Sequence, residues 1–126
     1  MRRGFLVFIF IFAGLVPAFA GGMVESKFYF GLSRPDGGQV EELQWRDFLI
    51  REVTPRFPDG FTVLDGYGQW RSGDIRIIAE RSKVLIVVHP STDEDAKALG
   101  EIKSAYIKRF HQESVFHTDQ DVRVVE

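Results

Sequence analysis

Three observations predict that this 126-residue chain forms one α+β domain behind an export signal. The first 20 residues resemble a cleaved leader, and the remainder is long enough for one domain but not for two. Segments of strand character and two segments with helical apolar spacing then follow in the order β-α-β-β-α-β. The chain has no cysteine, so its stability must come from a packed core. We expect a signal peptide at residues 1–20, a flexible lead-in at 21–26 and a single α+β domain at 27–126.

The leader has the three regions of a secretory signal peptide. Arg2 and Arg3 precede an apolar run at residues 5–16, and the small residues Ala18 and Ala20 stand at the two positions that a signal peptidase reads, with cleavage after Ala20. A retained transmembrane anchor is the alternative, but a spanning helix needs about 20 predominantly apolar residues. We therefore expect an exported protein, periplasmic or secreted, that meets the membrane only during export.

The first strand and the first helix are predicted between residues 27 and 54. Residues 27–32 form a dense aromatic run with strand character, and a Pro-Asp-Gly turn follows at 35–37. Residues 41–54 carry apolar side chains three and four positions apart, which gives a helix with one apolar face. Pro55 ends this helix, because the residue before a proline is disfavoured in the α region.

Two further strands are predicted in the middle of the chain. Residues 61–70 have strand character with two glycines, which suggests a bulge or a close backbone approach, and residues 71–74 suggest a hairpin turn. Residues 83–89 contain a continuous apolar run rich in β-branched residues. The segment Ile75–Ala79 is ambiguous and could be the beginning of this strand.

A second helix and a last strand complete the pattern. The sequence Ser-Thr-Asp-Glu at 91–94 resembles a capping box with Ser91 as the N-cap residue. The helix is expected to continue to about Gln112, with its large apolar residues on one stripe. Residues 115–125 then form the last predicted strand.

This order of elements is the ferredoxin-like arrangement, in which two helices cover one face of a four-stranded antiparallel sheet. Its central strands are the first and third, here residues 27–32 and 83–89, which are the two most apolar. A sheet covered on one face should alternate apolar with polar residues, but residues 84–88 are all apolar. We therefore expect the second face to be covered too, by a second copy in a homodimer, by a bound ligand or by loops of the chain.

Net charge limits the classes of partner. Residues 1–20 carry two of the 16 basic residues and none of the 18 acidic ones, so their removal lowers the formal net charge from −2 to −4. Nucleic-acid-binding domains carry a basic patch, so we expect no nucleic-acid partner.

Four ordered segments resemble a known family. They are FGLSRPDGG at residues 30–38, EVTPRFPDGFTVLDGYGQW at 52–70, ERSKV at 80–84 and QESV at 112–115. With these segments the chain resembles a family of small exported bacterial proteins known as domain of unknown function 3574, over nearly all of the part after the leader. The resemblance implies a single secreted domain and supplies no catalytic residues.

The histidine, acidic and basic residues favour structural roles over metal binding or catalysis. Three histidines with no standard ligand spacing predict no metal site, and we expect no cofactor. No G-x-S-x-G motif marks a nucleophile. Acidic residues within or beside the family-like segments could reach nearby arginines, which predicts structural ion pairs and, less favourably, general acid–base work. The candidate ion-pair network contains Glu52, Arg56, Arg71, Glu80 and Glu113.

Aromatic residues give the candidate binding surface. If Phe28 and Phe30 face the helices, Tyr29 faces the other way, and His89 could project on the same side. Tyr67 and Trp70 could line the rim from a neighbouring strand. Tyrosine and tryptophan combine apolar area with a polar group, which suits a pocket or a dimer interface, although ordinary packing is the plainer interpretation.

These observations favour a non-catalytic module that binds a small molecule or a protein, acting as a homodimer. The alternative is a small cofactor-independent enzyme, isomerase-like or monooxygenase-like, that uses the open sheet face with Tyr29, Tyr67 or His89 as acid or base. That alternative rests on analogy between folds alone.

Overall fold

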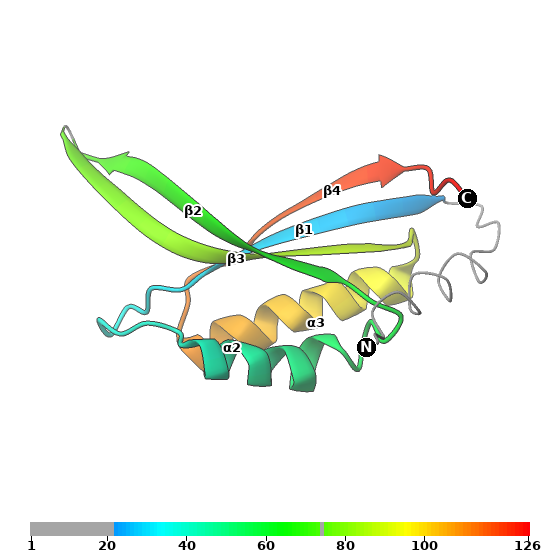
Figure 1. The fold of residues 1–126 in the computed structure, drawn as a ribbon, viewed down its shortest axis with the longest axis horizontal. Helices are drawn as coiled ribbons and strands as arrows, with labels where there is room; N and C mark the ends of the chain where they lie inside the picture. The colour runs from blue at the N-terminus through cyan, green and yellow to red at the C-terminus, as the bar shows by residue number, and fades with distance from the viewer. Residues whose placement is uncertain (1–21, 74) are drawn as a thin grey trace, which may run out of the picture.

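The computed structural model describes residues 22–73 and 75–126, and it confirms the predicted ferredoxin-like α+β fold. The signal peptide and part of the predicted hairpin turn lie outside these residues, so export stays a prediction. All strand pairs are antiparallel, in the sheet order β2-β3-β1-β4, and both helices lie on one side of the sheet (Figure 1). The elements are β1 (Met23–Gly31), α2 (Glu42–Phe48), η1 (Leu49–Val53), β2 (Thr62–Ser72), β3 (Arg76–Pro90), α3 (Asp93–Phe110) and β4 (Phe116–Val122).

Two strands are longer than expected. β1 begins at Met23, so residues 23–26 belong to the sheet and the expected flexible lead-in is wrong there. These residues pair with β3 on one side and β4 on the other, which satisfies their backbone groups. β3 is one continuous strand from Arg76, which places residues 76–79 in the sheet opposite the end of β2.

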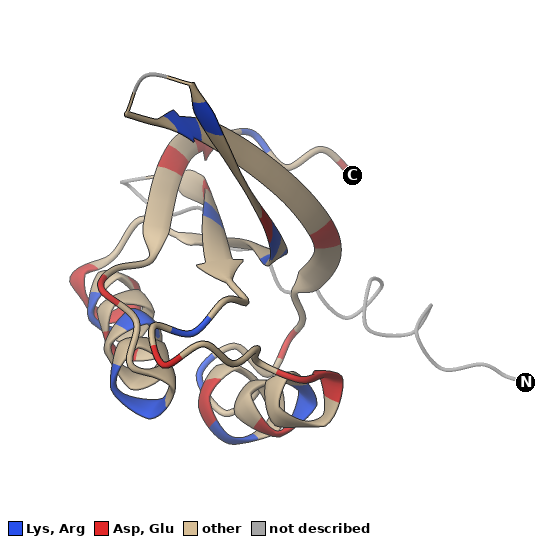
Figure 2. Ribbon diagram, turned by 90° about the vertical axis from the view of Figure 1, so that its left-hand side faces the viewer, with Lys and Arg blue, Asp and Glu red and all other residues tan. Residues whose placement is uncertain are grey.

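Side-chain hydrogen bonds cap the first turn of both helices. Glu41 and Gln44 form a capping box before α2, and the helix continues as the π-helix η1 up to Val53. The expected N-cap of α3 was one residue out, because Thr92 and not Ser91 accepts the Asp95 N–H, at 3.1 Å. Acidic and basic residues recur along both helices (Figure 2). Among the described residues, no helix is both long and apolar enough to cross a membrane.

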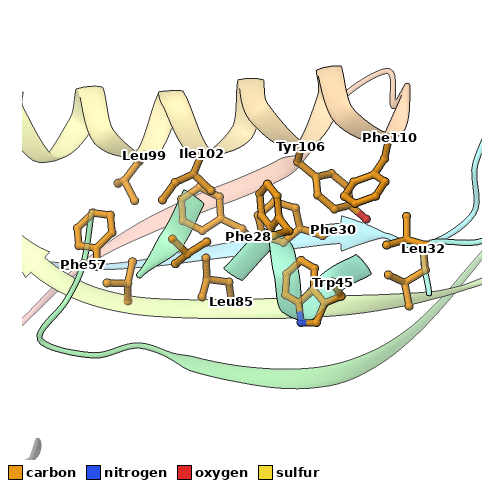
Figure 3. Packing of buried hydrophobic residues seen from close by; sticks show 14 residues of the cluster. Phe28, Phe30, Leu32, Trp45, Phe57, Leu85, Leu99, Ile102, Tyr106 and Phe110 are labelled. Atoms are coloured by element: carbon orange, nitrogen blue, oxygen red, sulfur yellow. The ribbon is translucent and has the colours of Figure 1, made fainter. Parts of the chain in front are cut away.

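The core lies between the sheet and the two helices and is dominated by aromatic rings (Figure 3). Phe30 is its centre, with ring centroids 4.7 Å from Tyr106, 5.2 Å from Trp45 and 5.8 Å from Phe48. The Tyr106 hydroxyl donates to the Gly31 carbonyl oxygen at 2.6 Å, so its polar end is satisfied. Burial raises the pKa of that hydroxyl well above its usual range. The side of the sheet away from the helices is called the open face below.

Candidate functional site

Small residues create a hollow in the open face. Residues directly opposite each other on antiparallel strands point to the same face. Ser82 of β3 lies opposite Gly31 of β1, and Gly68 of β2 lies opposite Glu80 of β3, so small residues of all three strands line the hollow. A Cβ at Gly68 would meet no atom within 4 Å, so the floor of the hollow is open at this position. The hollow has a volume of about 1210 Å³.

Aromatic residues line the hollow on two sides. On one side, Tyr29 of β1 and Phe116 of the edge strand β4 lie opposite each other, with ring centroids 5.5 Å apart. On the other side, Trp70 and Ile78 pair in the β2–β3 hairpin, whose far end extends beyond the helices (Figure 1). Tyr29, Trp70 and Phe116 remain 37%, 52% and 66% exposed, so their rings are available to a ligand.

A carboxylate stands at the floor of the hollow. Glu80 is half-buried, and its Oε2 accepts a hydrogen bond from the Ser33 N–H at 3.1 Å. A Cβ at Gly31 would come within 2.5 Å of that same oxygen, so the glycine makes room for the carboxylate. Within the part of the chain that the structure describes, Glu80 takes part in no ion pair.

Replacing Gly31 by alanine should therefore move Glu80. The new methyl group cannot share space with the carboxylate, so we expect loss of the Ser33 hydrogen bond and a fall of about 1 kcal/mol in the free energy of unfolding. Urea unfolding measures the stability, and the amide signal of Ser33 in NMR reports the bond. Gly68→Ala is the matched control, because a Cβ there meets no atom within 4 Å. An unchanged Ser33 signal in Gly31→Ala would show that the carboxylate is not fixed as described.

The four aromatic and histidine candidates do not form one site. Tyr29 and Trp70 line the hollow. Tyr67 does not line the hollow as predicted. It lies opposite Arg81, on the other face of the hairpin, and its hydroxyl donates to Gln69. His89 also differs from the prediction, which put it on the open face. Side chains of β3 alternate between the two faces, and His89 is buried on the helix side together with Leu85 and Val87.

The candidate ion-pair network is only partly present. Arg56 binds Glu52 at 3.1 Å and also Glu101, which was not among the candidates. Among the described residues, neither Glu80 nor Glu113 forms an ion pair with Arg56, Arg71 or another arginine; both line the hollow, while Arg56 binds Glu101 of α3.

A second ion-pair cluster went unnoticed in the sequence. Lys83 points toward the helices, and its ammonium group contacts Asp65 at 2.6 Å and Glu42 at 2.9 Å. Hydrogen bonds from Lys83 lower the pKa of both carboxyls. For Lys83 itself, burial alone would lower the pKa, but the two carboxylates outweigh it and raise it.

A chain of polar side chains that runs from the buried Ser26 to the surface also went unnoticed in the sequence. Ser26 is fully buried; its hydroxyl donates to Asp119 Oδ1 at 2.6 Å and lies 2.7 Å from His89 Nε2. His117 donates to the same Asp119 oxygen, and Lys103 contacts the other ring nitrogen of His117 at 2.9 Å. Burial would raise the pKa of Asp119, but the hydrogen bonds from Ser26 and His117 together lower it.

This polar chain has the residue types of a hydrolase but not the arrangement. A serine nucleophile must be reachable by its substrate and must be activated by a base. Ser26 has no exposed surface, and its hydroxyl is committed to Asp119. The signal in the sequence was the inward alternation Val24, Ser26, Phe28, Phe30, which the expected lead-in concealed.

The arrangement of side chains and cavities shows which kinds of ligand the described residues can hold. In the described residues, no three histidine, aspartate or glutamate side chains converge as metal ligands would. The polar chain borders a cavity of about 160 Å³ beneath α3, which is small beside the hollow. The hollow is therefore the feature best suited to an organic ligand.

Comparisons with known proteins place the fold and the family. Two solved structures of a phage SAM lyase are similar. The complex with S-methyl-5'-thioadenosine has a TM-score of 0.61 and 18% identity, covering 85% of this chain and 87% of that one. The apo state has a TM-score of 0.60 and 17% identity, covering 85% and 86%. At these identities the likeness concerns the fold alone. No curated protein matches the chain. The family described as a protein of unknown function, DUF3574, matches residues 25–125, and the chain belongs to that family.

Proposed function

We propose that this domain binds a small organic molecule in the hollow of the open face. The observation that carries the proposal is a half-buried carboxylate, Glu80, in a floor of small residues between exposed aromatic rings. Binding sites for small molecules are concave, largely apolar and supplied with a few polar groups of fixed position. The hollow combines these features in the part of the sheet that the helices leave uncovered.

A nucleoside thioether is the first ligand to test. A similar fold binds S-methyl-5'-thioadenosine. Such a ligand has a flat base that can stack on Trp70 or Tyr29, and a sugar whose hydroxyls suit the polar groups of Ser82, Gln112 and Glu113 around the hollow. The support is the match between this chemistry and the lining residues.

Replacing Trp70 by alanine should weaken this binding strongly. Stacking of a base on an aromatic side chain contributes about 1–3 kcal/mol, so we expect a loss of affinity of about 5- to 150-fold. Isothermal titration of the purified protein with S-methyl-5'-thioadenosine measures it. Tyr67→Ala is the control, because Tyr67 is an exposed aromatic residue of the same strand on the opposite face. Equal losses in both variants would place the ligand elsewhere, and no binding by the unaltered protein would exclude this ligand.

A homodimer is the second candidate, and the apolar part of the open face favours it. Leu64, 52% exposed, lies opposite Val84, and Ile86 and Val88 continue the apolar surface along β3. Exposed apolar patches of this kind often mark interfaces. The mass of the protein in solution tests this proposal, and a monomeric mass excludes it.

The enzymatic alternative has lost most of its candidate acid–base groups. Of Tyr29, Tyr67 and His89, only Tyr29 lines the hollow. A reaction in the hollow would therefore rely on Tyr29 together with Glu80, and we propose binding as the primary role.

A further inference from the structure

We infer that the hollow binds a positively charged organic molecule, such as a quaternary ammonium, in preference to an uncharged molecule of the same shape. This inference rests on the proposed function, since it names the chemical class of the molecule that the hollow takes. It depends on three features of the described residues: the absence of an ion pair at Glu80, the aromatic rings on both sides of the hollow, and the balance of charge around its rim.

Glu80 presents an uncompensated negative charge to the hollow. Its hydrogen-bond donor, the Ser33 N–H, is neutral, and no described lysine or arginine forms an ion pair with it. Other carboxylates in the domain, such as Asp47 and Asp65, contact cationic side chains. A half-buried carboxylate without such a partner attracts a cation from solution, because burial weakens the screening by water.

The rings that flank Glu80 favour the same charge. The face of an aromatic ring is negative, so a cation within about 6 Å of a ring centroid is attracted to it, most strongly by tryptophan. Tyr29 and Phe116 stand on one side of the hollow and Trp70 on the other. An organic cation with methyl groups can contact these rings through apolar surface and still place its charge near the carboxylate.

The remaining charges around the hollow do not reverse this balance. Arg34 lines the hollow, but its guanidinium group binds Asp36 at 3.2 Å and lies 5.8 Å from the centre of the Phe110 ring. Glu113 adds a second carboxylate to the lining. An anionic ligand would meet two carboxylates and one arginine already engaged by another acid, so the hollow disfavours anions.

Two probes of the same shape distinguish the effect of the ligand's charge on affinity from the effect of its shape. Choline and 3,3-dimethylbutan-1-ol differ in one atom, nitrogen or carbon, and therefore in charge. We expect choline to bind about tenfold more tightly, within the range of a cation beside an aromatic ring, with shifts in the NMR signals of Trp70 and Tyr29. In Glu80→Gln, which keeps the size of the side chain, the difference between the probes should largely disappear.

Glu25→Gln is the matched control. Glu25 lies on the open face outside the hollow and pairs with Lys27 at 3.5 Å, so its loss should leave the preference for choline unchanged. Equal affinity of the two probes for the unaltered protein would overturn the inference, whatever the variants do. If both probes bind equally and the nucleoside thioether also binds, the proposed function stands and only the charge preference fails. If none of the three molecules shifts the signals of Trp70 and Tyr29, both proposals are overturned.

Discussion

Replacing Phe30 by alanine should lower the free energy of unfolding by about 3–5 kcal/mol, the usual cost of removing a buried phenylalanine. Phe30 has no exposed surface and contacts Trp45, Phe48 and Tyr106, which come from both helices. Its loss therefore opens a cavity at the point where the sheet and the two helices meet. A domain of this size has about 5–15 kcal/mol of stability in total, so the substitution should remove a large fraction of it.

Phe116→Ala is the control for this prediction. It removes the same side chain from the opposite face of the sheet, where the ring is 66% exposed. We expect a change within about 0.5 kcal/mol, as for a surface substitution. Urea unfolding followed by circular dichroism compares the two variants. A large loss in Phe116→Ala would mean that the open face is covered in solution, and a small loss in Phe30→Ala would contradict the packing described here.

The difference between these two phenylalanines shows how stability and ligand binding are separated in this fold. The alternation of each strand directs one set of residues to the helices and the other to the open face. On the helix side, Phe28, Phe30, Leu85 and Val87 are buried in the core. On the open side, Tyr29, Trp70 and Glu80 line the hollow. Substitutions in the hollow can therefore be tested for binding with little loss of the folded state.

The order of elements followed from the sequence because each pattern was strong on its own. The aromatic run of residues 27–32 and the β-branched run of 83–89 predicted the central strands, and apolar spacing predicted both helices. Strand ends were harder to predict. Residues 76–79 pair only with β2, in a hairpin that extends beyond the helices, so no buried face imposes an alternation on them (Figure 1).

The site was only partly predictable because it depends on register. Tyr29 was assigned to the correct face, since its neighbours Phe28 and Phe30 are evidently core residues. His89 required a count from Leu85 along an unbroken apolar run, in which either set of residues could have faced inward. To predict the floor of the hollow, one needs the pairing of Gly68 with Glu80 and of Ser82 with Gly31, which joins residues of three strands. No local pattern contains that information.

Replacing Ser26 by alanine should lower the free energy of unfolding by about 1–3 kcal/mol, although only one oxygen atom is lost. Buried polar groups that lose a hydrogen-bond partner keep the cost of their desolvation. The Ser26 hydroxyl is the link between His89 of β3 and Asp119 of β4, at 2.7 and 2.6 Å. Without it, His89 Nε2 faces an apolar methyl group, and Asp119 Oδ1 loses the hydrogen bond from Ser26 and keeps the one from His117.

The same substitution should loosen the edge strand in particular. β4 pairs with β1 alone, so the side-chain link through Ser26 supplements a single ladder of backbone hydrogen bonds. We expect faster hydrogen exchange of the β4 amides in Ser26→Ala than in the unaltered protein, beyond the change in β2. Ser82→Ala is the matched control, because it removes a hydroxyl from the open face of β3, outside this chain of hydrogen bonds. If the two alanine variants lose equal stability and exchange alike, Ser26 is only a space-filling residue. If Ser26→Ala alone releases β4, the polar chain through Ser26 holds the strand that carries Phe116 in place, and the geometry of the hollow depends on it.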